Sequence, residues 1–287
     1  MSRSDRATGE LSILGYPIFF WLVFFVAAPL VLVAVLSFLT RGEYGGVEWH
    51  FTLENYRRVF EPIYLNIFWR SLKLSTITAL LCLFIGYPMA WAISSATPKL
   101  RTFYVLALAI PFMTNLIIRV YAIKIFVGMD GPLQWMLHFL HVPFDPYALT
   151  QNTALVFYGM VTSYLPFIVF PLYAALEKFD FSLVEAAQDL GASNFKILFG
   201  VITPNTRVAA LNSFTLVFIP CLGEFVIPDL LGGAKSMLAG NLITEQFLKV
   251  RDWPFGAALS VILIVLLLGA PLVLRRIFLG SFRGAGA

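Results

Sequence analysis

The sequence predicts an all-α integral membrane protein with six transmembrane helices. Of its 287 residues, 59% are hydrophobic and only 13% are charged, whereas a soluble domain carries about 25% charged residues. A helix needs roughly 20 mainly apolar residues to cross a bilayer core. Six stretches meet that length: residues 13–39, 74–93, 103–127, 155–176, 208–227 and 255–274. No internal repeat or low-complexity segment divides the chain, so one membrane domain over residues 1–287 is expected.

The first apolar stretch is predicted to be an uncleaved span. It follows a short basic start with Arg3 and Arg6, exceeds the length of a signal-peptide core, and has no small-residue cleavage pattern after it. Cys82 and Cys221 both fall inside later apolar stretches. Two such cysteines indicate neither a disulfide framework nor a metal site.

The distribution of Lys and Arg favours both termini in the cytoplasm. Both ends of the chain are basic, and residues 128–154 contain no Lys or Arg, which is typical of an external loop. The loops at 40–73 and 228–254 carry basic residues and argue the other way, but the rule weakens for long loops. The net charge of +4 does not indicate nucleic-acid binding, because the basic residues form no single stripe.

Prolines recur inside the predicted spans. They are Pro29, Pro88, Pro111, Pro166, Pro171 and Pro220. A single one is explained by ordinary kinking. Breaks at membrane depth survive only where protein or a water-filled cavity satisfies the freed backbone groups, so six together favour a bundle that changes shape.

A polar segment interrupts the apolar pattern between the fourth and fifth spans. Ser182 and Glu185 have the spacing of a capping box, which predicts the start of a short helix. Gly191 then stands where a left-handed stop is needed. Ser193 or Asn194 is expected to cap a second short helix over residues 195–200, before Pro204 opens the fifth span.

One face of the first short helix is apolar. It consists of Leu183, Ala186, Ala187 and Leu190, at helical spacing. Two interpretations are open for such a face on a loop: a helix lying on the bilayer surface, or a knob that inserts into a groove of a partner protein.

The same segment resembles the EAA loop of bacterial ABC importer permeases. Glu185-Ala186-Ala187 is followed after three residues by Gly191, and after nine more by Val201-Ile202-Thr203-Pro204. The usual ending is Ile-x-Leu-Pro, so the chain departs from the pattern at Val201 and Thr203. The resemblance implies the type I (MetI-like) permease fold, with short cytoplasmic coupling helices in the loop 177–207.

In that family the coupling helices dock onto a separate ATP-hydrolysing subunit. Carried over, Glu185, Ala186, Ala187 and Gly191 would transmit nucleotide-driven closure to the spans. ATP and Mg would be bound by that partner, and this chain would bind no cofactor and catalyse nothing. Consistently, the sequence has no phosphate-binding Gly-x-x-x-x-Gly-Lys-Ser/Thr loop, zinc motif or nucleophile elbow.

Several further passages resemble the membrane subunits of spermidine/putrescine importers. They are residues 86–91 (Gly-Tyr-Pro-Met-Ala-Trp), Asn115 to Tyr121, 183–191, 217–233 and 251–257 (Arg-Asp-Trp-Pro-Phe-Gly-Ala). The resemblance implies a bacterial inner-membrane protein that pairs with a second permease subunit, two copies of an ATP-binding subunit and a periplasmic polyamine-binding protein. Other cargo, such as ferric iron or thiamine, is the first alternative, and an ion-driven secondary transporter is the second.

The fifth span contains an ionisable residue, Glu224, that is a candidate for the substrate path. Polyamines carry several ammonium groups, which carboxylates and aromatic faces attract. Glu224, Asp229, Phe218 and Phe225 could supply both. The alternative is that Glu224 only caps a helix or forms an ion pair at the external end of the span.

Two basic residues in the third span, Arg119 and Lys124, work against a cation path. We expect Arg119 to form a structural pair with Glu224 or Asp229, or to reach the interface. His138 and His141 lie near each other in the external loop, but no third ligand is evident and a metal site is not predicted.

Overall fold

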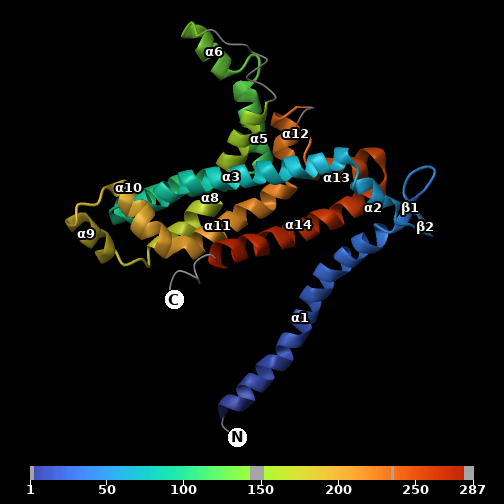
Figure 1. Cartoon of the computed structure of the whole chain (residues 1–287), viewed down its shortest axis with the longest axis horizontal. Coiled ribbons are helices and arrows are strands. Elements are labelled where there is room, and N and C mark those ends of the chain that lie inside the picture. The colour runs from blue at the N-terminus through green and yellow to red at the C-terminus, as the bar shows by residue number, and fades with distance from the viewer. Residues whose placement is uncertain (1–2, 143–151, 234–235, 281–287) are drawn as a thin grey trace. The chain divides into compact units, whose positions relative to one another are not determined.

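The computed structural model describes residues 3–142, 152–233 and 236–280. Most of the described chain is helical (Figure 1). Backbone packing divides it into two units, Met1–Tyr64 with Ile243–Val265 and Leu65–Leu242 with Leu266–Ala287, called here the first and second unit. Three helices contribute residues to both: α3 (Pro62–Ser94), α13 (Ala239–Glu245) and α14 (Trp253–Gly280).

The first unit begins with the long helix α1 (Arg3–Leu36). None of its apolar window Phe19–Leu36 is buried within the chain, as expected for a helix whose solvent is lipid or a neighbouring subunit. A small antiparallel hairpin follows, formed by β1 (Leu39–Arg41) and β2 (Val47–Phe51), and then the short helix α2 (Glu54–Val59). The π-helical turn η3 (Gln246–Val250) and the start of α14 complete the unit.

A buried carboxylate holds the parts of the first unit together. The side chain of Asp252 is 1% exposed, and its Oδ2 accepts a hydrogen bond from Arg58 Nη1 at 3.0 Å. Its Oδ1 accepts the N–H of Phe255 in the first turn of α14. The Arg58 guanidinium also lies 4.0 Å from the centre of the Phe255 ring. One ion pair therefore joins α2 to the beginning of the last span.

The second unit contains the remaining helices. They are α4 (Pro98–Phe112), α5 (Leu116–Val127), α6 (Pro132–Phe139), α8 (Thr153–Leu176), α9 (Ser182–Asp189), α10 (Asn194–Ile197), the π-helical turn η1 (Leu198–Ile202), α11 (Thr203–Gly223) and α12 (Val226–Leu231). The most extensive packing is between α8 and α11. A Cβ on Gly86 of α3 would lie 2.7 Å from Ile168 Cγ2 of α8, so this glycine permits the close approach of those two helices.

Within the described residues, five helices are long and apolar enough to span a membrane, and a bent pair makes a sixth. This agrees with the predicted fold class, but several spans differ from their predicted form. The second span begins earlier than predicted, at Pro62 rather than at Leu74. Residues 103–127 are not one helix, because the chain breaks between α4 and α5, and the segments Pro98–Phe112 and Leu116–Phe139 are bent by 87°. The fifth span begins earlier than predicted, at Asn194, and its helix ends at Gly223 rather than at Ile227.

We predict that Asp252→Ala lowers the free energy of unfolding by about 1–3 kcal/mol, because it removes the acceptor of a charged hydrogen bond and of a helix cap. Thermal unfolding of the purified protein in mild detergent measures this as a lower Tm. Glu43→Ala, which removes an exposed carboxylate of the same unit, is the control. Equal Tm values for the two variants would contradict the role given to Asp252.

Candidate functional site

The polar segment between the fourth and fifth spans folds as two short helices, α9 and α10, near the C-terminal end of α3 (Figure 1). The predicted Ser182–Glu185 capping box is not formed. Phe181 occupies the cap position without a side-chain bond, and Asp180 Oδ1 accepts the N–H of Ser182 at 3.0 Å. The signal was present in the sequence, since Asp180 also stands before the helix.

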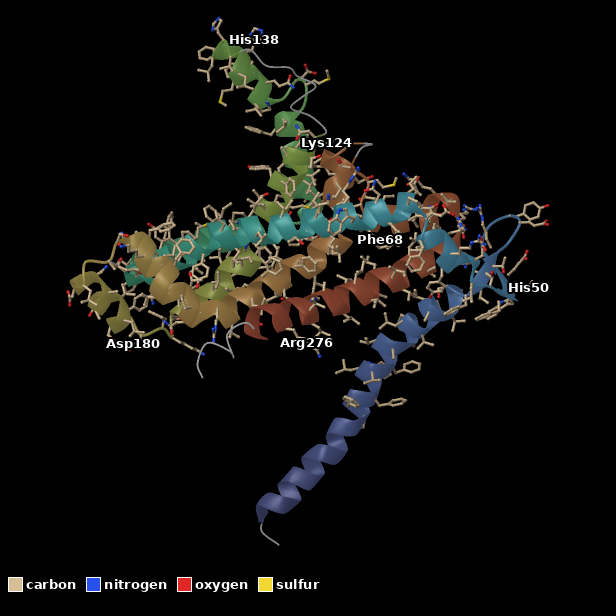
Figure 2. The ribbon with its side chains drawn as sticks, viewed as in Figure 1. His50, Phe68, Lys124, His138, Asp180 and Arg276 are labelled. Carbon is tan, nitrogen blue, oxygen red and sulfur yellow. The ribbon has the colours of Figure 1, made fainter. Side chains whose placement is uncertain are left out.

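Hydrogen bonds from the Ser182 side chain and backbone lower the pKa of the Asp180 carboxyl from its usual value. Figure 2 labels Asp180 at this end of the second unit. Because the pKa is lowered in the folded state, the contact stabilises the helix start above the ordinary pKa of Asp. The stabilisation is lost as the pH falls through the lowered value.

The predicted stop of α9 is confirmed. Gly191 has a φ of +77°, the left-handed conformation expected of a helix C-terminus. The N–H of Ala192 donates to the carbonyl of Ala187 at 3.0 Å, which completes the Schellman bond pattern. The predicted cap of the second short helix is also confirmed, because Ser193 Oγ accepts the N–H of Lys196.

The apolar face of α9 lies open. Leu190 is 89% exposed and Leu183 is 45% exposed, Ala186 is exposed and Ala187 is half-buried. We call these four residues the docking face. Only Val184, on another side of the helix, is buried against the chain. Glu185 is exposed on the same helix, on another side from the docking face. An open apolar surface on a short helix between two spans is suited to contact with another protein.

Glu224 lies at a break between α11 and α12. Its side chain is buried, and Oε2 accepts the O–H of Tyr164 at 2.5 Å. Its Oε1 accepts backbone N–H groups from Phe225, Val226 and Ile227, at 3.0, 2.8 and 3.4 Å. The carboxylate therefore caps α12, which is the structural role left open for it by the sequence.

Helix α13 also contacts the break between α11 and α12. A Cβ on Gly240 would lie 2.5 Å from the carbonyl oxygen of Gly223, so this backbone contact requires glycine. Asn241 Nδ2 donates to the carbonyl of Phe225 at 2.8 Å. Sequence reasoning missed both residues, because nothing in the local pattern of 239–241 indicates a contact with residues 223–225.

The other candidates for a substrate path face different surroundings. Phe218 is almost fully buried and stacks on Phe214 with the ring centres 5.8 Å apart. Phe225 and Asp229 are exposed. The four predicted path residues thus do not enclose one cavity within this chain. A path that uses Phe225 and Asp229 would need a second wall.

Arg119 holds the break in the third span. Its Nη2 donates to the carbonyls of Pro111, Phe112 and Thr114, at 2.8, 3.1 and 3.1 Å. These groups end α4, and Asn115 caps the start of α5 by accepting the N–H of Ile117. Among the described residues no ion pair joins Arg119 to Glu224 or Asp229, so the expected pairing is not formed.

Figure 2 shows His138 on α6 and Lys124 on α5. In the part of the chain that is described, no group of three or more His, Cys, Asp or Glu side chains could hold a metal ion. His138 and His141 therefore have no third ligand in that part of the chain.

The fold and the docking face together define a class: a multi-pass membrane subunit with an exposed contact helix between two spans. Residues 83–278 match the model of the binding-protein-dependent transport system inner membrane component family, and the chain belongs to this family. It is a transport permease of the inner membrane.

Individual relatives extend the match. The chain is 43% identical over 250 residues to the spermidine/putrescine transport system permease protein PotB of Haemophilus influenzae, covering 87% of each chain. It is 42% identical to PotB of Escherichia coli K12, covering 86% of this chain and 90% of that protein.

Solved structures agree in fold. A bacterial alginate ABC transporter in complex with an alginate pentasaccharide-bound periplasmic protein contains a chain with a TM-score of 0.78 at 14% identity, over 99% of this chain and 98% of that one. The MetNI methionine ABC transporter matches with a TM-score of 0.55 at 18% identity, over 74% of this chain and 94% of that one. The expected MetI-like permease fold is therefore confirmed.

We predict that Glu224→Gln lowers the free energy of unfolding by about 1–2 kcal/mol, since charge-assisted hydrogen bonds become neutral ones. Asp229→Asn makes the same chemical change at an exposed position. It is expected to change the free energy of unfolding by less than about 0.5 kcal/mol. Thermal unfolding of both purified variants gives the comparison, and a larger loss for Asp229→Asn would exclude the capping role.

Proposed function

We propose that this chain is the permease subunit of an ATP-driven importer that moves putrescine and spermidine into the cell. The observation that carries the proposal is the 42–43% identity to PotB proteins over 86–87% of the chain. Ferric iron and thiamine remain the alternatives for the cargo. The choice among them depends largely on an external receptor, which is a separate protein.

In this proposal the chain acts with three kinds of partner. A second permease subunit completes the membrane path, two copies of an ATP-binding subunit hold ATP and Mg, and a periplasmic polyamine-binding protein delivers the cargo. The presence of a periplasmic protein in the similar alginate transporter complex supports the last of these. The basic chain ends support an orientation with both termini in the cytoplasm.

The docking face would receive the ATP-binding subunit. Leu183 and Leu190 are exposed apolar side chains on α9, and their burial in a groove would provide the contact energy. Glu185 is exposed on the same helix, and the left-handed Gly191 sets the direction of the chain toward α10. Movement of α9 would then reach the fifth span directly, because α10, η1 and α11 follow one another without a loop.

The polyamine would pass along a surface shared with the second permease. Phe225 and Asp229 are exposed there as an aromatic face and a carboxylate, both of which attract ammonium groups. Glu224 would contribute from behind them, as a buried negative charge fixed by its hydrogen bonds. Phe218 would support the wall from the interior.

The test of the function is reconstitution. The four proteins are assembled in lipid vesicles, and ATP hydrolysis and uptake are measured with putrescine, spermidine, thiamine and ferric iron. We expect both activities to rise with the polyamines only. Polyamine uptake by this chain without an ATP-binding partner would exclude the importer, and stimulation by thiamine or iron alone would exclude the proposed cargo.

We predict that Leu190→Asp abolishes co-purification of the ATP-binding subunit without lowering Tm, because Leu190 is exposed and the new charge would be buried in the contact. Gln188→Asp places the same charge at an exposed position off the docking face and is expected to retain the partner. Retention by both variants would exclude this face as the docking surface.

A further inference from the structure

The short helices α9 and α10, called here the docking segment, are followed by a widened helical turn at the start of the fifth span. The π-helical turn η1 (Leu198–Ile202) lies between α10 and α11, and the N–H of Thr203 donates to the carbonyl of Leu198, five residues earlier. Pro204 follows directly. A proline has no N–H and its ring crowds the carbonyl one turn earlier, so a wider turn lets the helix continue past it. Such turns often mark functional positions.

Side chains of the next helical turn satisfy the carbonyls of this wide turn. Thr203 Oγ1 donates to Leu198 at 2.8 Å and Asn205 Nδ2 donates to Val201 at 2.7 Å. Thr206 Oγ1 donates to the carbonyl of Ile202 at 2.8 Å. Side-chain hydrogen bonds therefore stabilise the π turn. One of them comes from Thr203, where the chain departs from the usual EAA-loop ending.

The hydrogen-bond network of the π turn continues into α3 through Tyr87. The phenol oxygen of Tyr87 is hydrogen-bonded to Thr206 Oγ1, and both side chains are buried. A hydroxyl has one proton, and that of Thr206 is given to Ile202. In that arrangement Tyr87 is the donor to Thr206, while the geometry of the pair alone permits either donor. The phenol O–H can then be removed without removing the bond from Thr206 to Ile202.

Tyr87 stands at a point where α3 is itself tightly held. Its neighbour Gly86 packs directly against Ile168 of α8, and Pro88 removes a backbone donor from the α3 ladder. Displacement of Tyr87 would thus be transmitted to α3 near this proline. The passage 86–91 was distinctive in the sequence, and its hydrogen bond to Thr206 gives it a physical role.

We propose that Tyr87 is a positioning residue that couples α3 to the base of the fifth span. Its hydrogen bond to Thr206 makes α3 follow the π turn whenever the docking segment moves. This inference rests on the proposed function, because it assumes that a partner ATPase drives the docking segment.

The test measures transport and ATP hydrolysis in the same vesicles that contain the complete complex. Tyr87→Phe removes only the donor. It is expected to leave receptor-stimulated ATP hydrolysis intact and to lower uptake per ATP by about two- to tenfold, the range of one neutral hydrogen bond. Thr206→Val is expected to lower the same ratio, and Thr206→Ser to retain it. The double variant Tyr87→Phe/Thr206→Val is expected to fall no further than Thr206→Val alone, because that change already removes the Tyr87 hydrogen bond.

Tyr173→Phe is the matched control, because its phenol forms an exposed hydrogen bond to Glu177 at 3.3 Å. An unchanged ratio in Tyr87→Phe, or equal ratios in Thr206→Val and Thr206→Ser, would overturn the inference. If Tyr87→Phe does not assemble, the two Thr206 variants decide the question.

A wild-type complex without any polyamine response would instead overturn the proposed function. Hydrogen exchange on ATP addition then tests the coupling without cargo. In the wild type, the exchange rates of the amides in 198–206 and of those in α3 near Tyr87 are expected to change together. In Tyr87→Phe, only the exchange rates in 198–206 are expected to change. If the exchange rates of both segments change together in Tyr87→Phe as they do in the wild type, the inference is also overturned.

Discussion

The structure depends on one constraint: a backbone N–H or C=O group at membrane depth must have a partner within the protein. An uninterrupted helix meets this constraint by itself, but the third and fifth spans of this chain are interrupted, at three places in all. Each interruption exposes carbonyls or N–H groups that lipid cannot satisfy. The residues that matter most for the fold are therefore polar side chains placed beside the breaks.

Each break uses a different chemical solution. Carbonyls at and just after the end of α4 accept hydrogen bonds from a cation, the guanidinium of Arg119. Free N–H groups at the start of α12 are satisfied by an anion, the carboxylate of Glu224. Both charges agree with the helix dipole at their ends. In the π turn the side chains are neutral: the hydroxyls of Thr203 and Thr206 donate to backbone carbonyls. The charge of Arg119 and of Glu224 thus agrees with the kind of backbone group that each one satisfies.

This explains which parts of the structure could be predicted from the sequence. The number of spans follows from the length of apolar stretches, and the stop at Gly191 follows from its freedom to adopt a positive φ. Pro111 and Asn115 are residue types that suit a break in the third span. The apolar pattern continues across them, however, so the sequence predicts one uninterrupted helix there. Arg119 was assigned an acidic partner because backbone carbonyls leave no trace in a sequence. Gly240 and Asn241 could not be found, since their partners lie more than a dozen residues away and no periodic pattern links them.

The two interpretations of Glu224 are therefore not exclusive. A carboxylate that caps α12 is held rigid by its hydrogen bonds, and a rigid negative charge attracts a cation without further reorganisation. The same bonds use its oxygen lone pairs, so direct contact with an ammonium group would compete with the cap of α12. The exposed carboxylate of Asp229, one turn further on, has no such conflict. Under the proposed function, Asp229 and Phe225 would therefore contact the cargo directly, and Glu224 would supply a fixed negative field and hold the backbone beside them in place.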